Sequence, residues 1–188
     1  MQTPSTTSPD SSAARPSLRG GRSAQSNEGP SVPSEWLSFK LGDEEYGIDI
    51  LSVQEIRSFE KPTRMTNMPA FVLGVLNLRG VIVPVLDMRV KFNLERVEYG
   101  ELTVCIVLSI GHRTVGMVVD GVSDVVTLTP EQMRPVPEFS SGVGSEHLLS
   151  IGTLSKRLLM LIDIDKLMSS QEMGLVSANV GSIDTRRQ

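Results

Sequence analysis

Residues 74–92, GVLNLRGVIVPVLDMRVKF, contain the pattern that decides the fold. Two apolar runs rich in Val, Ile and Leu flank the dipeptide Arg79-Gly80, and they predict two strands joined by a tight turn. Asp87 then begins the segment DMRVKF and is suited to cap a short helix. The stretch therefore predicts a hairpin followed by a helical turn. Arg79 needs a separate explanation, because the strand pattern does not account for an arginine at this position.

The same unit occurs a second time in the chain. When the sequence is shifted by 76 residues, LNLRGVIVPVLDMRVKF aligns with GTLSKRLLMLIDIDKLM at 152–168, and Asp87 aligns with Asp163. A shift of 69 residues aligns LGDEEYGIDILSVQEI at 41–56 with IGHRTVGMVVDGVSDV at 110–125. Two matched blocks in the same order favour an internal duplication over a chance similarity.

Ten segments have the length and composition of strands and are separated by turn residues: 36–41, 45–50, 52–58, 71–78, 81–86, 102–109, 113–119, 122–128, 147–154 and 157–162. Only 87–92 and 163–173 suggest short helices. This series favours a β-sandwich or small β-barrels over a βαβ sheet. With the duplication, it predicts an all-β protein of two five-stranded barrels, formed by repeats at about 36–92 and 102–168.

Residues shared by the repeats are interpreted as requirements of the fold, and residues that differ are candidates for function. The shared group comprises Gly42 and Gly111, Gly47 and Gly116, and the helix caps Asp87 and Asp163. The turn differs, because Arg79-Gly80 aligns with Ser155-Lys156, so folding alone does not explain the arginine. Glu55 is expected to pair with Arg79, an interaction worth roughly 0–1 kcal/mol at a surface.

Pro84 is a second unusual residue of this hairpin, and it aligns with Met160. Proline donates no hydrogen bond to a neighbouring strand, so it favours an edge strand or a bulge. Two interpretations remain open at this point: Pro84 protects an edge from aggregation, or it faces a partner.

The composition narrows the class of protein. Residues 1–34 include nine Ser, five Pro, three Thr and three Gly, which predicts a disordered tail, and a flexible C-terminal tail is expected at 176–188. The net charge of -4 and the aromatic content of 4% argue against nucleic-acid binding. The longest apolar runs, VIVPVL and LLMLI, are too short to cross a bilayer, and no secretory signal is visible. A single cysteine fits a cytoplasmic protein.

No catalytic, metal-binding or cofactor-binding pattern is present in the sequence. The two histidines, His112 and His147, have no cysteine or histidine at the spacing of metal ligands. Cys105 lies within the apolar run LTVCIVLSI, where a buried small side chain is the simpler interpretation than a nucleophile. The sequence has no nucleophile elbow, P-loop or dinucleotide fingerprint. We therefore expect a non-enzymatic interaction module without cofactors.

Three stretches closely resemble the CheW family of bacterial chemotaxis coupling proteins: FKLGDEEYGIDILSVQEIR, PAFVLGVLNLRGVIVPVLDMRVKF and GMVVDGVSDVVTLTPEQMRPVPEF. The resemblance runs from about residue 35 to 175. It implies two five-stranded SH3-like barrels around a shared core. It also implies a non-catalytic adaptor that links transmembrane chemoreceptors to the histidine kinase CheA, cytoplasmic and associated with membranes only through receptor arrays.

The resemblance further implies two binding surfaces. One meets the regulatory domain of CheA through barrel-to-barrel contacts, and the other holds the tip of the receptor's cytoplasmic helical hairpin in a groove between the barrels. Carried over by motif, the groove residues are Val53, Glu55, Asn77, Arg79, Gly80, Val104, Val122 and Val125. The resemblance thus implies that Arg79 lies at or behind the receptor-facing groove, held there by Glu55.

Other functions fit the sequence less well. CheV joins a CheW-like domain to a receiver domain, and the 188 residues hold no second α/β unit. A coupling protein of a chemosensory pathway outside flagellar motility remains open. A small-barrel nucleic-acid binder is disfavoured by charge, and a hydrolase by the lack of a titratable dyad.

Overall fold

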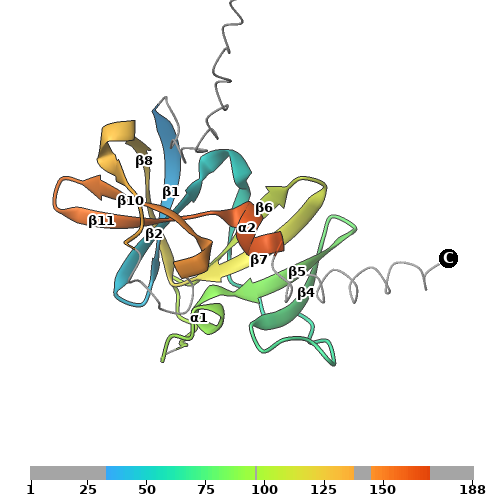
Figure 1. Ribbon diagram of the computed structural model, residues 1–188. Helices are drawn as coiled ribbons and strands as arrows, with labels where there is room; N and C mark the ends of the chain where they lie inside the picture. The colour runs from blue at the N-terminus through green and yellow to red at the C-terminus, as the bar shows by residue number, and fades with distance from the viewer. Residues whose placement is uncertain (1–32, 96, 138–144, 170–188) are drawn as a thin grey trace, which may run out of the picture.

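The computed structural model describes residues 33–95, 97–137 and 145–169 (Figure 1). The predicted N-terminal tail lies outside the described residues except at its end, where the first strand begins at Ser34. The predicted C-terminal tail, 176–188, also lies outside them.

The described residues form eleven strands: β1 (Ser34–Leu41), β2 (Glu44–Asp49), β3 (Val53–Ser58), β4 (Val72–Leu78), β5 (Val81–Asp87), β6 (Val104–Ile110), β7 (Arg113–Val119), β8 (Gly121–Leu128), β9 (Met133–Arg134), β10 (Leu148–Leu154) and β11 (Arg157–Ile162). All ten predicted strands are confirmed. The two-residue strand β9, in the proline-rich segment, was not predicted. Short helical segments complete the fold: α1 (Met88–Lys91), α2 (Ile164–Ser169) and 3₁₀ turns at Ile50–Ser52, Pro130–Gln132 and Ser145–His147.

Both predicted helix caps are confirmed. The carboxylate of Asp87 accepts a hydrogen bond from the backbone N–H of Arg89 at 3.0 Å, and that of Asp163 accepts one from Lys166 at 2.9 Å. Each cap satisfies an N–H group that has no partner inside its helix. Residues 170–173, the rest of the second predicted helix, lie outside the described residues.

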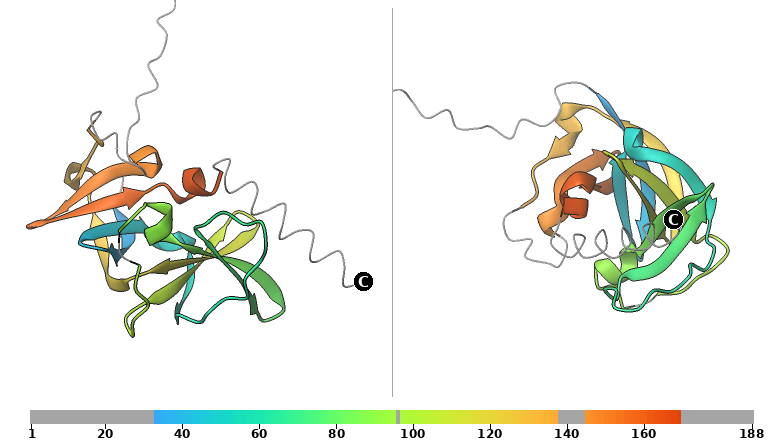
Figure 2. Two further views of the ribbon diagram at one scale, coloured as in Figure 1. Left: turned by 90° about the horizontal axis from the view of Figure 1, so that it is seen from below. Right: turned by 90° about the vertical axis from the view of Figure 1, so that its right-hand side faces the viewer.

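The strands form two sheets. Sheet A has the order β8-β1-β2-β11-β10-β9, and sheet B has the order β3-β6-β7-β5-β4. Figure 1 shows sheet A on the left and the β4–β5 hairpin of sheet B on the right. The views of Figure 2 agree that the β10–β11 and β4–β5 hairpins lie at opposite ends of the molecule.

Each sheet contains strands from both repeats, which corrects the prediction that each repeat forms a barrel by itself. Sheet A joins β1 and β2 to the last strands of the second repeat, and sheet B joins β6 and β7 to the last three strands of the first. A strand's apolar pattern records its burial and not its neighbour, so this exchange was invisible in the sequence.

The exchange keeps the symmetry of the duplication. If β1 to β5 are equivalent to β6, β7, β8, β10 and β11, the two sheets have the same strand order, apart from the added β9. Their parallel pairs, β2 with β11 and β5 with β7, also fall at equivalent places. The all-β class with two five-stranded units is therefore confirmed. The strand pairings of the described residues do not test closure into SH3-like barrels, which stays a prediction.

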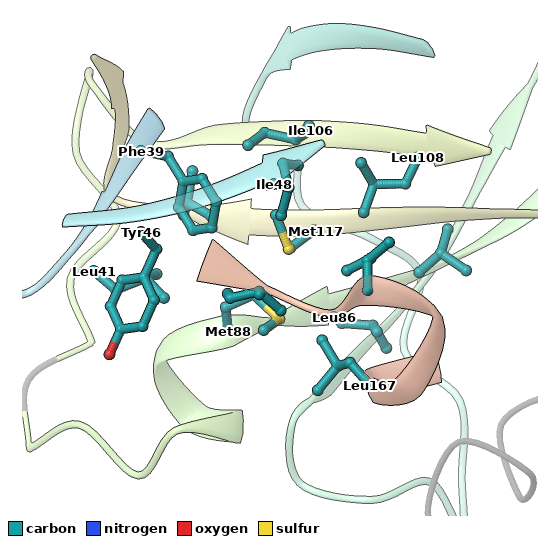
Figure 3. Packing of buried hydrophobic residues seen from close by; sticks show 14 of the residues in the cluster. Phe39, Leu41, Tyr46, Ile48, Leu86, Met88, Ile106, Leu108, Met117 and Leu167 are labelled. Atoms are coloured by element: carbon teal, nitrogen blue, oxygen red, sulfur yellow. The ribbon is translucent and has the colours of Figure 1, made fainter. Parts of the chain in front are cut away.

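The largest apolar core lies between the two sheets (Figure 3). Phe39 and Ile48 enter it from sheet A, and Ile106 and Met117 enter it from sheet B; all four are fully buried. Leu167 of α2 covers one side of this core. Each such side chain stabilises the fold by roughly 1.5–3 kcal/mol relative to exposure, so the two sheets are held together as one unit.

Each sheet also has a smaller core of its own. Trp36, Leu159 and Leu161 belong to that of sheet A, while Val85 and Cys105 belong to that of sheet B. Trp36 and Cys105 are equivalent in the duplication, as are Leu161 and Val85. The repeats therefore place equivalent residues in equivalent cores.

The shared glycines are required for two different reasons. Gly42 and Gly111 have φ values of +61° and +58°, a conformation that side-chain-bearing residues rarely adopt. At Gly47, a Cβ atom would lie 2.9 Å from Leu161, and at Gly116 it would lie 2.8 Å from Sγ of Cys105. The interpretation of these glycines as requirements of the fold is confirmed.

Pro84 lies in β5, which is flanked by β4 and β7, so the strand as a whole is not an edge strand, although its first half, including Pro84, has no partner on the β7 side. β5 pairs with β7 only from Val85 onward, where Val85 lies opposite Gly116. Because Pro84 precedes the residues that pair with β7, its lack of an N–H group removes no hydrogen bond between β5 and β7.

A buried ion-pair network ties the two sheets together at one edge of the core. The fully buried Arg89 guanidinium donates to both oxygens of buried Asp87, at 3.0 and 2.8 Å, and to Asp120 at 2.8 Å. Asp120 stands between β7 of sheet B and β8 of sheet A, and its second oxygen accepts from the N–H of Gly42 in the β1–β2 turn. Tyr99 donates to Asp87 at 2.8 Å.

Arg89 keeps its positive charge within this network. Burial works against the charged form of Arg89, but the hydrogen bonds and charges of Asp87 and Asp120 outweigh it and raise the pKa of the arginine. The sequence did not predict this network because its members lie far apart in the chain, from Gly42 to Asp120, and because Asp87 was expected only to cap a helix.

Candidate partner-binding site

The site is built around the β4–β5 turn. Arg79 and Gly80 have φ values of +54° and +90°, and Oδ1 of Asn77 accepts a hydrogen bond from the N–H of Gly80 at 2.8 Å. Positive φ at both central residues is typical of the tight turns that join twisted strands. Ser155, the equivalent of Arg79, also has a φ of +54°. The turn conformation therefore does not depend on arginine, and Asn77 has a clear role within the turn.

The predicted pair of Glu55 with Arg79 is present. Nη2 of Arg79 donates to Oε2 of Glu55 at 3.0 Å, which links β3 to the β4–β5 turn. The Arg79 side chain is 75% exposed, whereas that of Glu55 is 24% exposed. An ion pair this exposed contributes little to stability, so the guanidinium is oriented by the protein and still open to a partner.

Beside this pair lies a hollow of about 130 Å³. Its apolar wall consists of Leu78, Val81, Val83 and Val107, and its polar rim consists of Gln54, Glu55, Arg79 and Thr114. The hollow is about the size of one aliphatic side chain, and it offers a guanidinium and a carboxylate at its edge. Such a site can take an apolar side chain of a partner together with a charged one.

Sheet A has an equivalent hollow that is nearly closed, with a volume of about 10 Å³. The duplication aligns five of its lining residues, Ser38, Glu45, Leu154, Arg157 and Leu159, with Val107, Thr114, Leu78, Val81 and Val83 of the sheet B hollow. Where sheet B has Val81 and Thr114, sheet A has the larger Arg157 and Glu45, paired at 3.1 Å. The open hollow is therefore a property of one sheet and not of the repeated fold.

The structure brings together half of the predicted groove residues. Glu55 and Arg79 line the sheet B hollow, and Asn77 and Gly80 form the turn beside it. Val53 opens the same strand as Glu55, two residues before it.

The other predicted residues lie elsewhere. Val104 stands at the start of β6, opposite Ser58, and is partly buried against the central core. Val122 and Val125 belong to β8 of sheet A; Val122 also packs against the central core, and Val125 is 47% exposed. Their contact with a partner stays a prediction.

Arg57 is a member of the site that sequence analysis missed. Its Nη1 atom lies 3.5 Å from Oε1 of Glu55, the oxygen that Arg79 does not use. The available signal was the spacing Glu-x-Arg, because residues two apart in a strand lie on the same face.

The described residues show no reactive thiol and no metal-binding cluster that would add chemistry to the site. Cys105 is buried, and burial raises the pKa of its thiol to about 11, so the unreactive role expected for it is supported. Among residues 33–95, 97–137 and 145–169, no cluster of His, Cys, Asp or Glu could hold a metal ion. No helix in the described part of the chain is long and apolar enough to span a bilayer.

Comparisons with known proteins agree with the fold and with the resemblance. The model of the CheW-like domain matches residues 35–172. The chemotaxis protein CheW of Klebsiella aerogenes is 58% identical over 148 residues, which cover 79% of this chain and 89% of that protein. The probable chemotaxis protein CheW of Rhizobium etli is 36% identical over 138 residues, covering 73% of this chain and 89% of that protein.

A solved structure is also similar. The crystal structure of the scaffolding protein TtCheW from Thermoanaerobacter tengcongensis aligns with a TM-score of 0.69 and 25% sequence identity, covering 74% of this chain and 95% of that one. Family model, relatives and structure agree on one assignment. The chain belongs to the CheW-like domain family of chemotaxis scaffolding proteins.

Proposed function

We propose that this protein is a non-catalytic coupling protein that bridges chemoreceptors and the histidine kinase CheA, so that receptors control the activity of the kinase. Membership of the CheW family supports this role. The observation that carries it is the open hollow beside Arg79, because an oriented, exposed guanidinium at an apolar hollow is a binding feature that the fold does not need.

The receptor is the proposed occupant of this site. The cytoplasmic tip of a chemoreceptor is a helical hairpin, and an exposed helix presents neighbouring apolar and charged side chains to a groove. An aliphatic side chain of the hairpin would fill the hollow while a carboxylate pairs with Arg79, in a short charge-assisted hydrogen bond. The regulatory domain of CheA would bind elsewhere, through the barrel-to-barrel contacts that the family resemblance implies.

Coupling requires that the two surfaces belong to one rigid body. The core between the sheets and the Arg89 network at its edge tie sheet A to sheet B. A change of receptor arrangement can then bias the kinase between two activity states without chemistry in the adaptor, as a coupling free energy between two sites. Recruitment to membrane-associated arrays follows from receptor binding in this proposal.

The test is reconstituted kinase activity. Autophosphorylation of CheA is measured with receptor-containing membranes, with and without the protein. Stimulation that an attractant abolishes supports the coupling role. Binding to CheA without stimulation would assign the protein to another receptor set, and failure to bind CheA would refute the proposed bridge.

A further inference from the structure

Glu55 has an arginine at each of its two carboxylate oxygens. Nη2 of Arg79 lies 3.0 Å from Oε2, and Nη1 of Arg57 lies 3.5 Å from Oε1. Arg57 also reaches Glu60, whose Oε1 atom lies 3.5 Å from its Nη2. The four side chains form a row of alternating charge that runs from β3 to the β4–β5 turn.

The two arginines differ in their exposure to solvent. The Arg57 side chain is 32% exposed, close to the 24% of Glu55, whereas Arg79 is 75% exposed. Charges that are partly shielded from water interact more strongly and are screened less by salt. Arg57 is therefore the inner counter-ion of Glu55, and Arg79 is the outer one.

This difference matters when a partner binds. A carboxylate of the partner can pair with Arg79 only if Arg79 leaves Glu55. The carboxylate of Glu55 is largely covered, and leaving it without a cation would cost free energy. With Arg57 in place, Glu55 keeps a counter-ion after Arg79 has moved. The energetic cost of releasing Arg79 is therefore reduced by a residue that the partner does not touch.

We propose that Arg57 is a positioning residue that keeps Glu55 compensated, so that Arg79 can be transferred to a carboxylate side chain of the receptor tip. The choice of receptor rests on the proposed function. The sharing of Glu55 between two arginines does not, and it can be tested without a partner.

The first experiment uses the free protein. The rate of rotation about the Nε–Cζ bond of Arg79 is measured by NMR in the full chain and in Arg57→Gln. We expect slower rotation in the variant, because Glu55 then has Arg79 as its remaining arginine. Glu60→Gln is the matched control, since it removes a partner of Arg57 and leaves Glu55 paired as before. An unchanged rate in Arg57→Gln overturns the proposal.

The second experiment measures binding to receptor-containing membranes and, separately, to CheA. We expect Arg57→Gln to weaken receptor binding about two- to fivefold, the range of a partly exposed ion pair. The double variant Glu55→Gln/Arg57→Gln should restore it, because a neutral amide no longer competes for Arg79. A double variant as weak as Arg57→Gln would instead indicate a merely structural role and refute the transfer.

The outcomes separate this proposal from the proposed function. A loss confined to CheA binding overturns the assignment of the receptor as the partner of Arg79. If the unaltered protein binds neither receptor nor CheA, the proposed function fails, whereas the rotation rate of Arg79 still decides whether Arg57 shares the charge of Glu55.

Discussion

Nη1 of Arg157 lies 3.1 Å from Oε1 of Glu45, and this ion pair of sheet A occupies the place at which sheet B is open. Arg157 is equivalent to Val81, and Glu45 is equivalent to Thr114. The hollow measures about 10 Å³ in one sheet and about 130 Å³ in the other. The duplicated fold thus contains both an open and a closed form of the same surface, and the closed form suggests how to block the open one.

Val81→Arg gives sheet B the residue that sheet A already carries. Val81 is 55% exposed, so we expect the variant to fold normally. Excluding one aliphatic side chain from the hollow should weaken receptor binding by roughly tenfold or more. The matched control is Arg157→Val, which opens the hollow of sheet A and should leave receptor binding unchanged. Equal effects of the two variants would contradict the assignment of the site to sheet B.

Arg79→Ala tests whether the arginine serves binding or folding. The Glu55–Arg79 pair is exposed, so its loss should lower the free energy of unfolding by no more than about 1 kcal/mol. Receptor-dependent activation of CheA should fall nonetheless. Ser155→Ala is the control, because Ser155 has the same φ of +54° at the equivalent turn. A strongly lowered melting temperature with loss of β-sheet circular dichroism would return Arg79 to a structural role.

Arg89→Met should be far more damaging than any change at the surface site. It leaves Asp87, which is fully buried, without its cation, and breaking a buried pair on one side costs about 3–5 kcal/mol. Urea denaturation measures the change in the free energy of unfolding. Arg157→Val again serves as the comparison, because it removes an ion pair of a half-exposed arginine. A loss below about 1 kcal/mol would show that the network does not hold the two sheets together.

Much of the fold could be predicted because the strands and helices are determined by short local sequence patterns. Alternating apolar residues marked the strands, and the aspartate caps marked both helices. The repeat identified glycines that a side chain would obstruct, such as Gly47 against Leu161. The pairing of β2 with β11 joins residues more than 110 positions apart, and no local pattern records it.

The site was predictable in part for a similar reason. Arg79 differed between the repeats, and its partner Glu55 was a charged residue on a strand. Arg57 has its role only through the position of its guanidinium relative to one carboxylate oxygen. The hollow depends on side chains of five strands from both repeats, β3, β4, β5, β6 and β7, so it could not be predicted before the exchange of strands was known.

The phenol of Tyr99 makes the stability of the fold depend on pH in the alkaline range. Burial and its hydrogen bond to Asp87 raise the pKa of Tyr99 from 10.0 to about 12. A raised pKa means that the protonated phenol is favoured in the folded state. Its contribution is therefore complete below pH 10 and is lost as the pH rises from about 10 to 12.

The free energy of unfolding is measured between about pH 9 and pH 12, at steps of roughly one pH unit, for the protein and for Tyr99→Phe. We expect a shallower decline in the variant. Some decline should remain, because burial and Glu44 also raise the pKa of Tyr46. Identical slopes would show that the pKa of Tyr99 is not raised in the folded protein.

Cys105 reports on the integrity of sheet B without any substitution. Its side chain is 2% exposed, and burial raises the pKa of the thiol from 9.0 to about 11, so the reactive thiolate is about one part in a thousand at pH 8. We expect Ellman's reagent to label the folded protein only at the rate of unfolding, and to label it immediately in denaturant. Val81→Arg and Arg79→Ala should label as slowly as the unaltered protein, while Arg89→Met should label faster. Rapid labelling of the unaltered protein would mean that β6 opens to solvent, and a loss of binding in any site variant would then need to be separated from a loosened sheet.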